Sequence, residues 1–67
     1  MSDRVLTQRE YQVVLLVAEG LTNAEIAGRL WISPGTVRRH LENVFAKLGV
    51  HTRTAAVARV RDGEPCR

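Results

Sequence analysis

The chain has 67 residues, which is the length of one small domain and leaves no room for a second hydrophobic core. Hydrophobic residues make up 45% of it and the net charge is +3, values typical of a folded globular domain. Its longest apolar run, residues 13–18, is far shorter than the ~20 residues that cross a bilayer, so we expect a cytoplasmic protein without a membrane partner. The single cysteine, Cys66, excludes an internal disulfide and is expected to be an incidental free thiol. With two separated histidines, the sequence also predicts no metal, cofactor or small-molecule ligand.

Two capping boxes predict where the first two helices begin. Thr7 is followed three residues later by Glu10, and Thr22 by Glu25, so that each side chain can bond the other's backbone N–H. Apolar residues at helical spacing follow both caps. The expected helices cover about residues 8–19 and, after Thr22, continue to residue 30 or 31.

The next two helices follow from equally local signals. Ser33 before Pro34 predicts the start of a third helix, which we expect to reach Leu48 before Gly49 ends it. Thr52 is the expected cap of a fourth helix. The three or four residues between the second and third helices match the corner of a helix-turn-helix. The sequence therefore predicts an all-α domain over residues 1–67, with a core of about 6–61 and frayed ends.

The third helix is predicted to have two faces. Val37, Leu41, Val44 and Leu48 recur at helical spacing and mark the buried stripe. The opposite face of the helix forms a polar ridge: Gly35, Arg38, Arg39, Glu42, Asn43, Ala46 and Lys47. Trp31, just before this helix, is expected to plug the core beside the corner.

The basic excess lies on the third helix and the turn after it, because residues 33–53 carry a net charge of +3 and residues 1–20 carry −1. An α-helix fits the DNA major groove, where Arg38 and Arg39 can pair with guanine and Asn43 with adenine. Glu42 can accept from cytosine, orient Arg38 or repel the phosphates, and these alternatives stay open.

Further residues are expected to hold phosphate oxygens and so to fix the orientation of the duplex. Free N–H groups and the helix dipole favour an anion near the starts of the second and third helices, although the same hydroxyls can act as caps alone. The expected phosphate contacts are Thr22, Asn23, Ser33, Thr36, Lys47 and Arg53. For Arg53, an ion pair with Glu10 is an alternative hypothesis.

The chain resembles the LuxR-type (GerE-like, NarL/FixJ-like) helix-turn-helix domain over about residues 6–61. The matching motifs are LTQRE, AEGLTNAEIAGRL and WISPGTVRRHLENVFAKLGVHTR, followed by the AAV of the fourth helix. This resemblance implies a transcription regulator whose third helix enters the major groove, with Arg38, Arg39 and Glu42 facing bases. It also implies that Thr36, Asn23, Ser33 and Lys47 contact the DNA backbone.

In the family that the chain resembles, the fourth helix mediates dimerisation on inverted half-sites. Val57, Val60 and Arg61 would then form the dimer seam, with ordinary core as the alternative for the same residues. Self-association would also supplement the marginal stability of so short a chain. RNA polymerase is a further candidate partner, and both a stand-alone regulator and an effector domain of a response regulator are consistent with the resemblance.

A helical adaptor that binds an acidic partner protein through the basic ridge is the alternative function. An enzyme is not expected, because the sequence has no catalytic cluster of nucleophile, base and orienting group and no glycine-rich phosphate loop.

Overall fold

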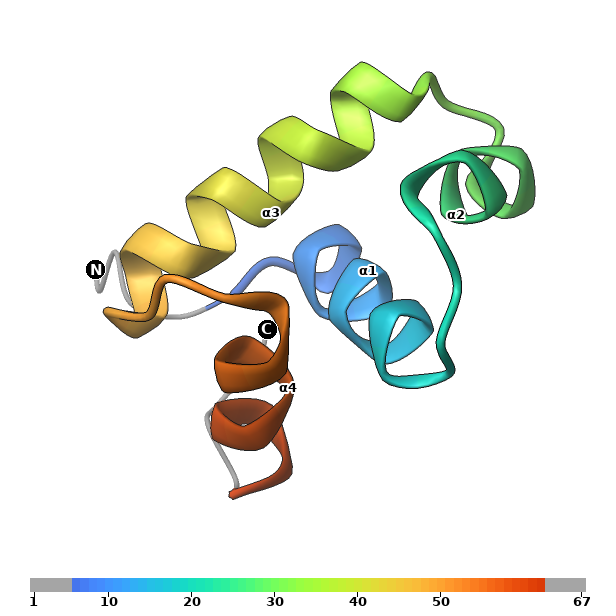
Figure 1. The fold of residues 1–67 in the computed structure, drawn as a ribbon. Coiled ribbons are helices and arrows are strands. Elements are labelled where there is room, and N and C mark those ends of the chain that lie inside the picture. Colours follow the sequence, from blue (N-terminus) through green and yellow to red (C-terminus); the bar gives the residue numbers. More distant parts are fainter. Residues whose placement is uncertain (1–5, 63–67) are drawn as a thin grey trace.

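The computed structural model describes residues 6–62, which form four α-helices (Figure 1). They are α1 (Gln8–Ala18), α2 (Asn23–Leu30), α3 (Pro34–Leu48) and α4 (Arg53–Arg61). The predicted all-α class and all four helix positions are confirmed, with α1 ending one residue earlier than expected. The ends that we expected to fray and Cys66 lie outside the described residues. Within residues 6–62, no helix has both the length and the apolar character needed to cross a membrane.

Each helix begins directly after the residue predicted as its cap. The hydroxyls of Thr7, Thr22, Ser33 and Thr52 each accept a hydrogen bond from the backbone N–H three residues further on. The first two caps are full capping boxes, since the glutamate at that third position accepts from the cap's own N–H. These bonds satisfy backbone donors that the helices cannot satisfy internally. Helix starts are therefore encoded within four residues of sequence.

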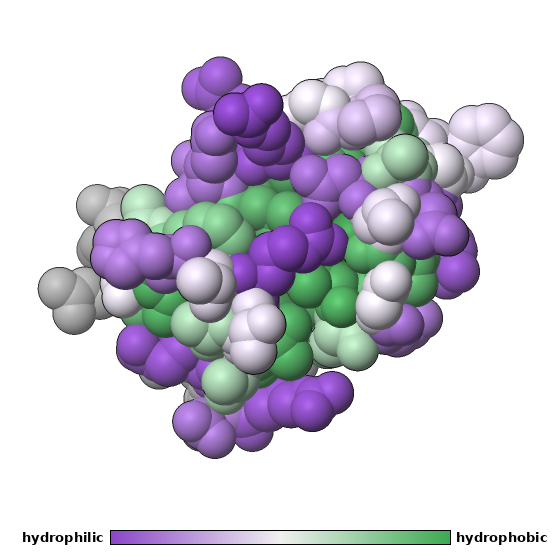
Figure 2. Space-filling view, in the orientation of Figure 1, coloured by the Kyte–Doolittle hydropathy of each residue, from purple (hydrophilic) through white to green (hydrophobic). Residues whose placement is uncertain are grey.

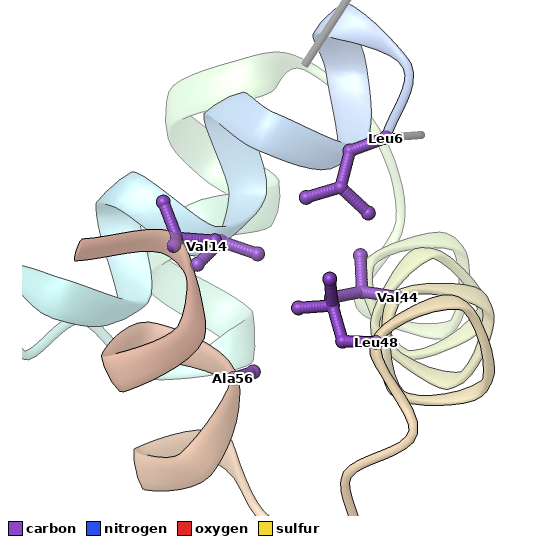
Figure 3. Packing of buried hydrophobic residues seen from close by; sticks show 6 residues of the cluster. Leu6, Val14, Val44, Leu48 and Ala56 are labelled. Carbon is purple, nitrogen blue, oxygen red and sulfur yellow. The ribbon is translucent and has the colours of Figure 1, made fainter. Parts of the chain in front are cut away.

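Helix α1 lies at the centre and contributes to two hydrophobic clusters. One cluster joins α1 to α3 and α4 and is shown in Figure 3; it contains Leu6, Val14, Val44, Leu48, Ala56 and Val60. The other joins α1 to α2 and α3; it contains Val13, Leu16, Ile26, Ala27, Val37 and Leu41. Phe45 packs against both clusters. The core is thus continuous along α3, with α2 near the start of that helix and α4 near its end (Figure 1).

The expectation that Trp31 fills the core is wrong. Its residue exposure is 93%, and it ends α2 in the left-handed conformation with φ 61°. The left-handed turn lets the N–H of Ile32 reach the carbonyl of Ala27 at 3.1 Å, and it sends the tryptophan side chain outward. Leu30 and Ile32, on either side of Trp31, pack against the core instead.

Two adjacent leucines in α1 provide a direct test of this packing. Leu16 is buried in the cluster between α1, α2 and α3, whereas Leu15 is 42% exposed. We expect Leu16→Ala to lower the free energy of unfolding by about 2–5 kcal/mol, through lost burial and a residual cavity. Leu15→Ala makes the same change in helix propensity and should cost less than about 1 kcal/mol. Urea denaturation followed by circular dichroism measures both, and equal losses would contradict the packing described here.

Candidate nucleic-acid interface

Helix α3 presents one polar side to the surroundings because its other side is buried. Its four apolar stripe residues, Val37, Leu41, Val44 and Leu48, all lie in the core. The exposed residues on the opposite side are Gly35, Arg38, Arg39, Glu42, Asn43 and Ala46, and we call them the outward face of α3. In Figure 2 the rim of the molecule along α3 is largely hydrophilic, and apolar side chains are visible between the helices. The predicted polar ridge is therefore present, apart from Lys47.

An ion pair joins two members of the outward face. The Nε of Arg38 lies 3.5 Å from Oε2 of Glu42, one helical turn further along α3. The two side chains are 77% and 63% exposed. Of the three roles left open for Glu42, the geometry of the free protein favours the orientation of Arg38. The pair stays accessible to a ligand because it lies outside the core.

Lys47 faces the body of the protein. Its Nζ lies 2.7 Å from Oε1 of Glu10 on α1, and its side chain is only 22% exposed. The alternative hypothesis that Glu10 pairs with Arg53 is therefore wrong. Lys47 is three residues after Val44, so it sits at the edge of the buried stripe, and this spacing was the available signal for an inward-facing position.

Glu10 is itself almost fully buried and serves two purposes. The same Oε1 accepts a hydrogen bond from the backbone N–H of Thr7 at 2.9 Å and from Lys47. Burial alone would raise the pKa of Glu10, but the bonds from Lys47 and Thr7 together with the charge of Lys47 outweigh it and lower the pKa. The carboxylate is thus held ionised while it links the start of α1 to the last turn of α3.

Arg53 also makes contacts within the protein. Its Nη1 donates to Oδ1 of Asn23 at 2.7 Å, and its Nη2 donates to the carbonyl of Leu21 at 3.0 Å. Arg53 begins α4 and Asn23 begins α2, so one guanidinium ties the starts of two helices together. Because Asn23 accepts through its oxygen, its amide nitrogen can donate elsewhere.

The remaining hydroxyls expected at phosphates are exposed, and two of the three act as caps. Thr22 belongs to the capping box of α2, and Ser33 caps α3. The hydroxyls of Ser33 and Thr36 lie 2.9 Å apart and share a hydrogen bond. The caps use the oxygens of Thr22 and Ser33 as acceptors, and a hydroxyl also carries one proton that it can donate. The bond between Ser33 and Thr36 uses the proton of one of these two hydroxyls and leaves the other for a further acceptor.

The three residues expected at a dimer seam occupy different environments on α4. Val60 is buried in the cluster between α1, α3 and α4, Val57 is half-buried and Arg61 is exposed. Val57 and Arg61 line a groove of about 370 Å³ between α4 and the end of α1. Arg59, which the sequence reasoning did not single out, donates to the carbonyl of Leu48 at 2.8 Å and so ties α4 to the end of α3. Val60 fits the alternative of ordinary core.

The described part of the chain offers no metal centre. Among residues 6–62, no three histidine, cysteine, aspartate or glutamate side chains are grouped closely enough to hold a metal ion. The site instead combines the exposed side of α3, two exposed arginines on that side, and hydrogen-bond donors at the starts of neighbouring helices.

Comparisons with known proteins agree with this arrangement. The family model described as bacterial regulatory proteins, luxR family, matches residues 4–60. The HTH-type transcriptional regulator Rv0890c of Mycobacterium tuberculosis is 51% identical over 61 residues, and the transcriptional regulatory protein LnrK of Bacillus subtilis is 48% identical over 59 residues. These matches cover 90% and 87% of the chain but only 7% and 27% of the two relatives. The chain therefore spans a small part of the length of the curated relatives it matches.

The lowered pKa of Glu10 predicts a pH-dependent stability. A carboxylate whose pKa is lower in the folded state stabilises the fold above its ordinary value of 4.5, and this contribution is lost as the pH falls through the folded value. We expect Glu10→Gln to lower the free energy of unfolding at pH 7 by about 1.5–3 kcal/mol, because Lys47 loses a charged partner. The loss should shrink as the pH falls below 4.5.

Glu25→Gln is the matched control, since Glu25 closes the other capping box and is exposed. Urea denaturation of both variants between pH 3 and pH 7, compared with the native chain, makes the measurement. A Glu10→Gln loss that is the same at every pH, or no larger than the Glu25→Gln loss, would refute the role of the buried charge.

Proposed function

Because the chain belongs to the luxR family of bacterial regulatory proteins, we propose that it is the sequence-specific, double-stranded DNA-binding part of a transcription regulator that works in the bacterial cytoplasm. The family membership confirms the expectation that this domain is not an enzyme. The names of its relatives, which describe transcriptional regulators, support the proposal.

The single observation that carries the proposal is the outward face of α3. A helix fits the major groove, and this one offers Arg38, Arg39 and Asn43, whose side chains can pair with guanine and adenine edges. Gly35 and Ala46 at its two ends are small and allow close approach to the duplex. In the proposed complex α3 lies in the major groove with this face toward the bases.

The proposed phosphate contacts divide into direct and supporting ones. Thr22, Ser33 and Thr36 are exposed at the starts of α2 and α3, where hydroxyl protons, backbone N–H groups and the helix dipole favour an anion. Asn23 is a direct contact, and Arg53 supports it. Arg53 holds the side-chain oxygen of Asn23, so that the amide nitrogen of Asn23 faces the phosphate. Lys47 contributes positive charge near the backbone while it stays paired with Glu10.

We further propose that the protein binds DNA as a homodimer through α4, on inverted half-sites about one helical turn apart. The groove lined by Val57 and Arg61 supports this, since it leaves an apolar side chain and a cation on the surface of α4. Val60 would support the seam from within the core. RNA polymerase is a further proposed partner of the dimer on DNA.

Selection from a random duplex pool at near-physiological salt tests the function. Enrichment of one inverted motif would support sequence-specific binding by a dimer. Equal retention of all duplexes would refute the proposed function, and binding to an acidic protein that no duplex displaces would favour the helical adaptor instead.

Arg38→Ala should weaken binding to the selected duplex by about 1–3 kcal/mol and relax specificity at one base pair, because a bidentate contact with guanine is lost. Fluorescence anisotropy with the selected duplex and with single-base variants measures the effect. Arg29→Ala is the control, because Arg29 is an exposed arginine on α2 and its substitution removes the same charge. Equal losses on selected and random DNA would reject the base-reading role of Arg38.

Val57→Thr should reduce cooperative binding to two half-sites by about tenfold while leaving affinity for a single half-site within about twofold. The change keeps the shape of the side chain but places a hydroxyl in the proposed seam, where it lacks a partner. Val50→Thr makes the same change at a half-buried valine outside the helices. Mobility-shift titrations on one and two half-sites distinguish them, and unchanged cooperativity in Val57→Thr would argue against a seam on α4.

A further inference from the structure

We propose that Glu42 determines the base specificity of this domain, because it and Arg38 act as one unit that reads a single G·C base pair. This inference rests on the proposed function and assigns a specificity role within it.

The two side chains converge on the outward face of α3. Arg38 and Glu42 are separated by one helical turn, and the contact between them runs from Nε to Oε2 at 3.5 Å. Nε is the nitrogen nearest the aliphatic part of the arginine. The terminal fork of two nitrogens is therefore available on the far side of the guanidinium, and the second carboxylate oxygen, Oε1, is available on Glu42.

Stability gives little reason for an acid at this position. Both side chains are mostly exposed, at 77% and 63%, and exposed ion pairs contribute little to folding. The order is also the less favourable one, because an acid that precedes the base on a helix pairs better than an acid that follows it. On a face directed at DNA, the negative charge of Glu42 weakens attraction to DNA of any sequence, because the phosphates carry the same sign of charge. A residue that lowers general affinity without stabilising the fold can act by rejecting unsuitable sequences.

The chemistry of one base pair matches the pair of side chains. In the major groove a G·C pair offers the acceptors N7 and O6 of guanine and, next to them, the N4 amino donor of cytosine. The fork of Arg38 supplies two donors for N7 and O6, and Oε1 of Glu42 supplies an acceptor for the N4 amino group. Together the side chains complement both bases of the pair.

Two of the three other arrangements fail against the same unit. The third, a T·A pair, keeps an acceptor (thymine O4) and an amino donor (adenine N6) in the places of guanine O6 and cytosine N4, and it loses only the N7 contact, where the thymine methyl group lies. An A·T pair places the O4 acceptor of thymine where the carboxylate needs a donor, and it gives the arginine fork an amino donor in place of O6. A reversed C·G pair brings the cytosine amino group to the arginine and guanine O6 to the carboxylate. Arg38 alone would reject these pairs by a missing contact, whereas Glu42 adds repulsion. Glu42 thereby trades general affinity for discrimination.

The test measures discrimination at the base pair that depends on Arg38. This pair is first identified on the selected duplex as the position where Arg38→Ala reduces preference most, with a measurable preference remaining. Binding of the native chain, Glu42→Gln, Arg38→Ala and the double variant is then measured on four duplexes with each base pair at that position. We expect Glu42→Gln to reduce the preference for G·C over A·T and over C·G by about tenfold and to raise affinity for random DNA by about threefold. In the Arg38→Ala background the same change should alter preference by less than about twofold.

Glu19→Gln is the matched control, because Glu19 is an exposed glutamate at the end of α1 and its removal changes the net charge equally. It should leave base preference unchanged. Full discrimination retained in Glu42→Gln would overturn the inference, as would an equal effect of Glu42→Gln with and without Arg38. Both results leave the proposed function intact, whereas failure of the native chain to prefer any duplex would overturn the function and the inference together.

Discussion

The buried stripe of α3 is the constraint on which the rest of the structure depends. Val37 and Leu41 pack with α1 and α2, while Val44 and Leu48 pack with α1 and α4. Anchoring one helix in two clusters fixes its rotation about its own axis. A slip by one residue would turn the stripe by about 100° and bring charged side chains into the core. The outward face of α3 is therefore determined by burial on the other side of the helix.

Polar contacts reinforce this orientation at defined points. Glu10 binds the last turn of α3 through the side chain of Lys47, and Arg59 binds the same turn through the carbonyl of Leu48. Arg53 joins the starts of α2 and α4 through Asn23 and the carbonyl of Leu21. A carboxylate buried to 4% exposure is costly without a partner, so its pairing with Lys47 specifies one arrangement of α1 against α3. Two cations that the sequence suggests as phosphate contacts are thus used to hold the surface that is proposed to face the DNA.

The sequence predicts the helices well because their signals are local. Four caps and the stripe of α3 lie within a few residues of the features that they determine, and the structure agrees with each. The partner of Glu10 was not predictable in the same way, since Lys47 and Arg53 are both cations far along the chain and only packing selects between them. The prediction that Trp31 is buried was wrong for a different reason. Apolar character predicts burial, but a left-handed residue at a tight corner points its side chain by backbone geometry.

Two ion pairs within residues 6–62 show how burial changes what a charge can do. Glu10 and Lys47 are 2.7 Å apart and largely shielded from solvent, so neither charge can move without loss of stability, and the pair acts on the fold. Arg38 and Glu42 are exposed and 3.5 Å apart, which makes their interaction weak in the free protein. A weak exposed pair can take further partners through its remaining polar atoms when a base edge displaces water, and the attraction within the pair then grows because the local dielectric falls. Glu42, the acid that contributes little to folding, is thus the one positioned to interact with the proposed DNA ligand.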